Sequence, residues 1–131
     1  MPVIVHCRYS HARALDMLVE AGIERAVFHW YAGPRDLLDT ILENGYFISA
    51  TPAVRYSVKH RDAVRAAPLE RLLLESDCPV DYRGGPSSPS DVLQSLREVA
   101  RLKELPPVQV ARVTTENVAR FLAPTRREES L

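Results

Sequence analysis

The stretch Arg25-Ala26-Val27-Phe28-His29-Trp30-Tyr31-Ala32-Gly33 decides the fold that we predict for this chain. Its first half is a short apolar run, and its second half becomes polar and aromatic before a glycine. A short apolar run bounded by turn residues is typical of a strand buried on both faces of a parallel sheet. Three other runs have the same character: Val3-Ile4-Val5, Tyr46-Phe47-Ile48 and Leu72-Leu73-Leu74. The sequence therefore predicts four buried strands.

Apolar residues at helical spacing fill the segments between these runs, and glycines follow the first two helices as stop signals. The apolar positions of these two helices are Leu15, Leu18, Val19, Leu37, Leu38, Ile41 and Leu42. A more polar helix is expected over 57–66, another after Ser90 as its cap, and a last one over 107–122. Strands that alternate with helices indicate right-handed βαβ units and a parallel sheet, which places the chain in the α/β class.

The composition is that of an ordinary globular domain. Hydrophobic residues make up 46% and charged residues 26% of the 131 residues, and 17 basic residues balance 17 acidic ones. The net charge therefore gives no argument for nucleic acid, although a local basic patch remains open. No apolar run approaches the roughly 20 residues of a membrane span, and no signal-peptide pattern opens the chain. We expect a cytoplasmic protein in which Cys7 and Cys78 are small buried thiols.

Polar residues follow each predicted strand at the point where it ends. His6 comes after the first strand, His29 after the second and Asp77 after the fourth. Because the carboxyl ends of parallel strands share one rim, these three side chains should converge there. Imidazole and carboxylate together suit a divalent metal ion. Each residue also has a purely structural interpretation. The histidines could be hydrogen-bonded structural residues, and Asp77 could cap the loop that follows it. Trp30 and Tyr31 could simply pack over a helix start.

Six motifs in a fixed order carry a resemblance to a known family. They are PVIVHCR (2–8), AVFHWYAG (26–33), GYFIS (45–49), LLLESDCP (72–79), YRG (82–84) and TTENVARF (114–121). In this order, and over about residues 2–122, the chain resembles the TatD family of metal-dependent deoxyribonucleases. The resemblance implies hydrolysis of phosphodiesters in DNA with a divalent ion such as Mg²⁺, Mn²⁺ or Zn²⁺.

The resemblance also implies roles for individual residues. His6 and His29 match the family's histidine metal ligands, and Asp77 matches the carboxylate that contacts the metal and handles the proton of the attacking water. Arg8 and Arg83 are candidate phosphate contacts, because a guanidinium matches two phosphate oxygens at once. The chain departs from the family pattern at Trp30-Tyr31 and Ser76, and the loop after Arg83 lacks the usual Asn.

A full barrel of this family resembles the eight-stranded TIM fold, for which about 250 residues is typical. The matched strands are the fifth to the eighth, and the His-x-His pair and the bridging Glu of the first half have no counterpart here. We therefore expect half of a TIM-type barrel in a single domain over 1–122, with a charged tail over 123–131. Isolated activity of such a half is doubtful.

An open half-barrel would leave two sheet edges and an apolar face uncovered. Residues of that face are expected among Val3, Val5, Val27, Phe47, Leu72 and Leu74. We expect a homodimer or a separate N-terminal half as partner, unless the C-terminal helices over 107–122 cover the face. A basic cluster of Arg55, Lys59, His60 and Arg61 contacts DNA or is simply a solvated helix start. The alternative functions are hydrolysis of a small amide or ester, and a non-catalytic assembly module.

Overall fold

The computed structural model describes residues 1–124, and the chain builds one sheet of four parallel strands in the order β1-β2-β3-β4. The strands are β1 (Val3–Val5), β2 (Ala26–Phe28), β3 (Phe47–Ala50) and β4 (Leu72–Leu74). The four predicted strands and their parallel α/β arrangement are confirmed. Of the predicted charged tail, 123–131, all but residues 123 and 124 lies outside the described residues.

Within the described residues, five helices connect and follow the strands. They are α1 (His11–Glu20), α2 (Arg35–Glu43), α3 (Val58–Ala66), α4 (Val92–Lys103) and α5 (Pro107–Leu122), with short 3-10 turns at Pro52–Arg55, Leu69–Arg71 and Pro89–Asp91. The expectation that Ser90 caps α4 was wrong. Ser88 and Asp91 form a capping box on the 3-10 turn Pro89–Asp91, and Asp91 directly precedes α4. Proline favours the first helical position, which places the cap at Ser88, two residues before Ser90. Within residues 1–124, no helix is long and apolar enough to cross a membrane.

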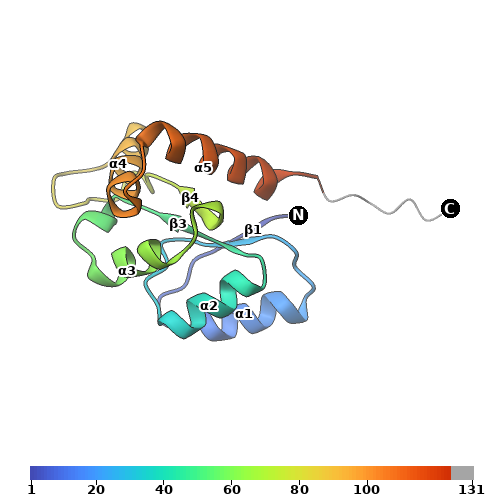
Figure 1. Cartoon of the computed structure of the whole chain (residues 1–131). Coiled ribbons are helices and arrows are strands. Elements are labelled where there is room, and N and C mark those ends of the chain that lie inside the picture. The colour runs from blue at the N-terminus through green and yellow to red at the C-terminus, as the bar shows by residue number, and fades with distance from the viewer. Residues whose placement is uncertain (125–131) are drawn as a thin grey trace.

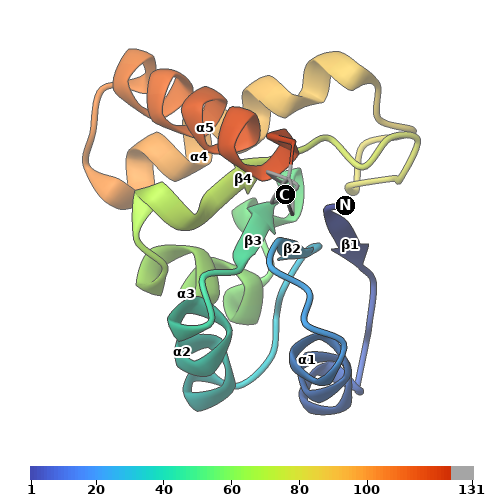
Figure 2. The same cartoon turned by 90° about the vertical axis from the view of Figure 1, so that its right-hand side faces the viewer.

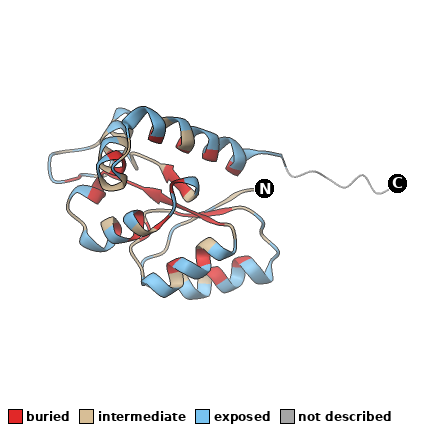
Figure 3. Cartoon of the chain, viewed as in Figure 1, coloured by how far each residue is buried: buried red, intermediate tan, exposed pale blue. Residues whose placement is uncertain are grey.

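Helices α1, α2 and α3 cover one face of the sheet, and α5 crosses on the other side (Figure 1). Ala26, Phe28, Ile48 and Leu72 point from the strands into the larger core, where they meet buried residues of the helices. Burial is concentrated along the sheet and on the helix sides that face it (Figure 3). Burial of this continuous apolar layer is the main favourable term in folding.

The opposite face of the sheet, which we call the inner face, carries Val27, Phe47 and Leu73. Phe121, near the end of α5, packs on these three residues and makes an edge-to-face contact with Phe47, with ring centroids 5.9 Å apart. Figure 2 shows the end of α5 lying across the strands. Ile4 of β1 pairs with Val27 but stays 70% exposed. The C-terminal helix therefore covers part of the inner face and leaves its β1 edge open.

Of the six residues among which the inner face was expected, Val27 and Phe47 lie on it. Val3, Val5, Leu72 and Leu74 all pack against the core on the helix side. Side chains alternate between the two faces of a strand, so Leu73 takes the inner position and its neighbours do not. Because Leu72, Leu73 and Leu74 are all apolar, the sequence does not show which of them lies on the inner face.

Candidate metal centre

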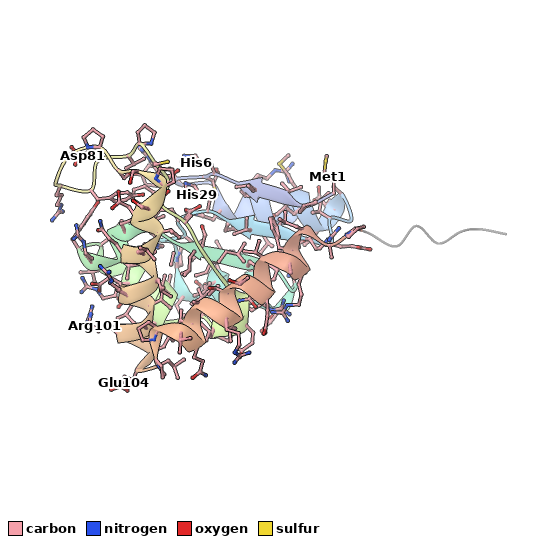
Figure 4. All side chains as sticks on the ribbon, turned by 90° about the horizontal axis from the view of Figure 1, so that it is seen from above. Met1, His6, His29, Asp81, Arg101 and Glu104 are labelled. Atoms are coloured by element: carbon pink, nitrogen blue, oxygen red, sulfur yellow. The ribbon has the colours of Figure 1, made fainter. Side chains whose placement is uncertain are left out.

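The carboxyl ends of the strands bring His6, His29 and Glu75 to one rim of the inner face. The sheet ladder continues past the strands, since His29 N–H donates to Val5 O and Glu75 N–H donates to Ala50 O, each at 3.0 Å. Every second side chain of a strand points to the same face, so His29 lies on the inner face two residues after Val27, and Glu75 two residues after Leu73. Figure 4 shows His6 and His29 together at the end of the sheet near the loop that carries Asp81, with Met1 at the other end.

His29 lies between two carboxylates. Its Nδ1 is 2.5 Å from Glu75 Oε1, and its Nε2 is 3.4 Å from Asp77 Oδ2. The contact with Glu75 is the largest cause that raises the pKa of His29 above its usual value; partial burial opposes it, and the charges of Glu75 and Asp77 add to it. The site is therefore electronegative and attracts a proton or a metal cation to His29.

These separations suit two donors of one metal ion. Two atoms bound tetrahedrally at roughly 2.1 Å from an ion lie about 3.4 Å apart, and His29 Nε2 and Asp77 Oδ2 are 3.4 Å apart. The rings of His6 and His29 have centroids 5.5 Å apart, close to the about 5 Å expected for two imidazoles on one ion. Nevertheless, within residues 1–124 no group of three His, Cys, Asp or Glu side chains converges well enough to hold an ion. The chain thus offers two paired donors, His29 and Asp77, with His6 beside them.

Glu75 is a site residue that the sequence reasoning missed. Its Oε1 is buried and, apart from the contact with His29, finds no hydrogen-bond partner among the described residues. A carboxylate on the second ring nitrogen fixes the tautomer of a ligating histidine and raises its basicity. The sequence feature that could have identified Glu75 is its position at the end of a buried strand, two residues before Asp77.

Two residues of this rim have a left-handed backbone, Trp30 with φ 50° and Asp77 with φ 46°. This conformation is uncommon for residues other than glycine, and such strain concentrates at functional sites. The Trp30 N–H donates to Ser49 Oγ at 3.1 Å, which ties the turn after β2 to β3. The turn at Trp30 is therefore held in place by the neighbouring strand.

His60 does not belong to an exposed basic cluster, so that expectation was wrong for this residue. It is completely buried, its Nδ1 lies 2.7 Å from Tyr31 O, and Thr51 N–H donates to its Nε2 at 3.2 Å. Burial lowers its pKa to about 4, so the ring is neutral at physiological pH and Nδ1–H is the donor. His60 therefore anchors the turn that follows His29.

The remaining predicted residues lie around the rim. Arg8 is exposed and lines a pocket together with His6 and His29. The Arg83 guanidinium lies 4.0 Å from the centre of the Tyr56 ring. The expectation of two buried thiols was wrong: Cys78 is exposed and Cys7 is half-buried, and both are free. The turns that bring functional residues to the rim also expose the cysteines beside them.

Residues 1–123 match the family model described as TatD related DNase. The chain belongs to this family. The TatD-related chain is 36% identical over 128 residues to the protein named Uncharacterized metal-dependent hydrolase YcfH of Escherichia coli, with 92% of this chain and 48% of that protein covered. It is 34% identical over 135 residues to the 3'-5' ssDNA/RNA exonuclease TatD of Musicola paradisiaca, with 92% and 51% covered.

Solved structures agree with the fold. YJJV, a TatD homologue from Escherichia coli, superposes with a TM-score of 0.83 at 26% identity, covering 95% of this chain and 51% of that one. A TatD family hydrolase from Entamoeba histolytica superposes with a TM-score of 0.82 at 20% identity, covering 95% and 52%. The chain thus spans about half the length of the relatives it matches, as half of a barrel should.

Proposed function

We propose that this chain carries part of the active site of a metal-dependent hydrolase that cleaves phosphodiesters in DNA. One observation carries the proposal: His29 presents Nε2 3.4 Å from Asp77 Oδ2 while Glu75 occupies its other nitrogen. This arrangement suits a metal-binding histidine with its supporting carboxylate. Relatives named metal-dependent hydrolase and ssDNA/RNA exonuclease support the same reaction class.

His6, His29 and Asp77 would hold a divalent ion, with Mg²⁺, Mn²⁺ and Zn²⁺ as candidates. When bound, such an ion lowers the pKa of water and polarises a phosphoryl oxygen. Asp77 would accept a proton from the attacking water, whose oxygen bonds to phosphorus. The bond from phosphorus to the leaving sugar oxygen breaks, and that oxygen takes up a proton. Glu75 would keep His29 in the ligating orientation throughout.

The arginines supply the substrate side of the proposal. Arg8 lines the pocket beside His6 and His29, and it is free to turn toward a phosphate because its side chain is exposed. Arg83 lies in the loop between β4 and α4. A guanidinium contacts two phosphate oxygens in a fixed geometry, which favours a phosphodiester over a neutral amide or ester.

We also propose that donors from outside this chain complete the centre. A second copy of the chain, or a separate N-terminal half, would add strands beside β1 and β4 and cover Ile4. The support is the exposed Ile4 on the inner face and the lack of a converged three-donor group within residues 1–124. Sedimentation at micromolar concentration tests this part, and a compact, well-behaved species of 14.7 kDa contradicts it.

Metal binding and DNA cleavage test the proposal together. We expect Mn²⁺ to bind the purified chain, as measured by calorimetry, and the binding to be lost in His29→Ala and in Asp77→Asn. We expect cleavage of DNA in Mn²⁺ to be weak, and to disappear in the same variants. Arg112→Ala on α5 is the control and should match the unmodified chain. Metal binding that survives both site variants would contradict the proposed centre.

A further inference from the structure

The pocket beside the free edge of β4, which we call the β4 groove, lies away from the candidate metal centre. It encloses about 260 Å³ between β4, α4 and α5 and is lined by Leu74, Val92, Leu93, Leu96, Ala111, Thr114, Thr115 and Val118. No charged residue from the described part of the chain lines it, and Leu93 and Val118 remain 49% and 37% exposed. An exposed groove without a charge to hold a polar ligand suits the apolar side chains of a protein partner.

The backbone of β4 is open beside this groove. Glu75 N–H donates to Ala50 O of β3 at 3.0 Å, and the peptide groups of a parallel strand turn alternately to its two sides. Leu74 therefore turns its N–H and C=O away from β3. Two residues earlier, the side-chain amide of Asn117 donates to Leu72 O at 2.8 Å. Helix α5 thus covers the edge at Leu72 and leaves it open at Leu74.

The edge of β1 is the other end of the sheet (Figure 2). Val3 N–H donates to Arg25 O, and Val5 O accepts from His29 N–H, each at 3.0 Å, so both valines turn their peptide groups toward β2. Ile4 between them turns its N–H and C=O to the free edge, and its side chain is 70% exposed. An open edge with an exposed apolar side chain recruits another strand.

The two open edges fit each other in direction. All four strands are parallel, with β1 and β4 at opposite ends of the sheet. A two-fold axis along the strands places β1 of each copy parallel to β4 of the other, which closes an eight-stranded sheet and leaves no free edge. The 17 basic and 17 acidic residues balance each other, so net charge does not drive two copies apart.

The register of this contact follows from closure of the barrel. Residues that are level with one another across the sheet form the row Val5, Phe28, Ile48 and Leu72. Leu74 is thus level with Cys7 of its own chain. An eight-stranded barrel with a shear of eight shifts the row by about four residues in each half. Leu74 therefore meets Val3 of the second copy, because a shift in the other direction would reach His11, which belongs to α1.

This register matches the chemistry of both faces of the sheet. Val3 and Leu74 lie on the helix side, so Val3 of the second copy enters the β4 groove. Ile4 of the second copy is enclosed inside the barrel, and its N–H faces Leu74 O. Three residues beyond Val3 and Leu74, His6 of the second copy is level with Asp77.

We propose that the β4 groove binds β1 of a second copy of this chain, so that two copies close one barrel and each adds its His6 to the rim beside Asp77 of the other. The docking itself rests on the two open edges. The contribution of His6 rests on the proposed function, because it takes the metal rim from His29 and Asp77. Within residues 1–124 of one copy, that pair has no converged third donor.

Sedimentation of the full chain at micromolar concentration tests the docking. We expect a species of twice 14.7 kDa. Thr115→Glu puts a charge into the β4 groove at a side chain that is exposed in the single copy. It should raise the dissociation constant of the dimer by at least about 100-fold, because each dimer then buries two unpaired charges. Gln109→Glu adds the same charge to α5 outside the groove and should leave the dimer unchanged.

The β1 side of the contact is tested by Ile4→Pro. Proline removes the N–H that faces Leu74 O in the dimer, and an edge strand tolerates proline because that N–H does not bond within the sheet. The dimer should be lost while circular dichroism shows that the single copy keeps its fold. Ile4→Val keeps the N–H and a β-branched side chain, and it should keep the dimer.

The contribution of His6 is tested by calorimetry with Mn²⁺ on the same variants. Thr115→Glu changes none of the candidate ligands, so a centre contained in one copy would bind Mn²⁺ as before. We expect this variant to lose most of its Mn²⁺ affinity, because it separates His6 of one copy from Asp77 of the other. Gln109→Glu should bind Mn²⁺ as the unmodified chain does.

Each possible result decides a stated part of the proposal. A monomer at every concentration overturns the second copy and leaves the β4 groove to a separate N-terminal half. An open series of larger species overturns the two-fold closure, and a dimer that resists both Thr115→Glu and Ile4→Pro overturns the assigned interface. Unchanged Mn²⁺ affinity in Thr115→Glu overturns the contribution of His6. A dimer that binds no Mn²⁺ overturns the proposed metal centre and leaves the docking intact.

Discussion

The two ends of the inner face differ in chemistry although the same strands build both. Near the amino ends, Val27, Phe47 and Leu73 are buried beneath Phe121. At the carboxyl ends, two residues further along, His29 and Glu75 take the same face and are only partly buried. The alternation of side chains along a strand decides which residues lie on this face. Their position along the strand decides whether they pack in the core or take part in the candidate site at the carboxyl end.

The difference teaches how this half-barrel divides stability from chemistry. The end beneath Phe121 excludes water and contributes to folding, as apolar burial does. The other end gathers the His6–His29 pair and two carboxylates, and these carboxylates, Glu75 first, raise the pKa of His29. Substitutions at the first end should therefore change the free energy of unfolding, and those at the second should mainly change binding.

The largest effect is expected from Phe121→Ala. Phe121 is 5% exposed and closes the apolar end of the inner face, and truncation of a buried phenylalanine costs about 3–5 kcal/mol. Urea unfolding followed by circular dichroism measures this loss. Leu122→Ala is the matched control, because its neighbouring side chain is 59% exposed and should cost well under half as much. Equal losses in the two variants would contradict the packing of Phe121 on the inner face.

The fold was predictable from sequence wherever a local period was enough. The strand runs around Val27 and Phe47 and the helices between them needed only neighbouring residues. The packing of Phe121 on Val27 was not predictable, because it joins residues far apart in the sequence. The burial of His60 was not predictable either, because a histidine among basic residues at the start of a helix is expected to be exposed to solvent.

The candidate site was predictable in outline and not in its contacts. Parallel strands bring His6, His29 and Asp77 to one rim whatever the detail, and their order along the chain was sufficient for that. The pairing of Glu75 with His29 depends on which rotamers the packed rim allows, and no pattern in the sequence encodes this. The metal-binding role of the three predicted residues stays a prediction.

The second effect concerns His60, which supports the rim from below and should make folding sensitive to acid. Its pKa is lowered from 6.5 to about 4 in the folded chain, so the unfolded chain binds more protons between these values. Stability is therefore full above about pH 6.5 and falls by up to about 3 kcal/mol as the pH drops toward 4.

Urea unfolding between about pH 7 and pH 4 tests this expectation. The raised pKa of His29 acts in the opposite direction, because its stabilisation is present at low pH and is lost as the pH rises through the folded value. The comparison with His60→Gln isolates His60, since the variant keeps His29. The variant should be less stable at neutral pH and less sensitive to acid. An unchanged pH slope would show that His60 is not neutral when folded.

A smaller effect is expected at the rim from Glu75→Gln. The substitution keeps the shape but removes the charge that lies 2.5 Å from His29 Nδ1. Loss of such a supporting carboxylate lowers metal affinity by about 10- to 100-fold. Calorimetry with Mn²⁺ measures this affinity, and an alkaline buffer reduces the competition from protons for His29. Glu116→Gln on the exposed side of α5 is the control, and an equal affinity in all three chains would exclude a supporting role for Glu75.

The smallest effect is expected from Ser49→Ala, at the boundary between the two ends. Ser49 lies on the inner face beyond Phe47, is 3% exposed, and accepts the hydrogen bond from Trp30 N–H at 3.1 Å. Its loss leaves a partly buried donor unpaired, which costs about 1 kcal/mol. The left-handed turn at Trp30 then loses one of its restraints, so the emission of this single tryptophan should shift while cooperative unfolding is kept. Ser95→Ala is the matched control, because Ser95 Oγ–H donates to Glu75 O at 2.8 Å on the β4 side. It should cost a similar free energy without shifting the emission, and a shift in both variants would mean that the rim responds as one unit rather than turn by turn.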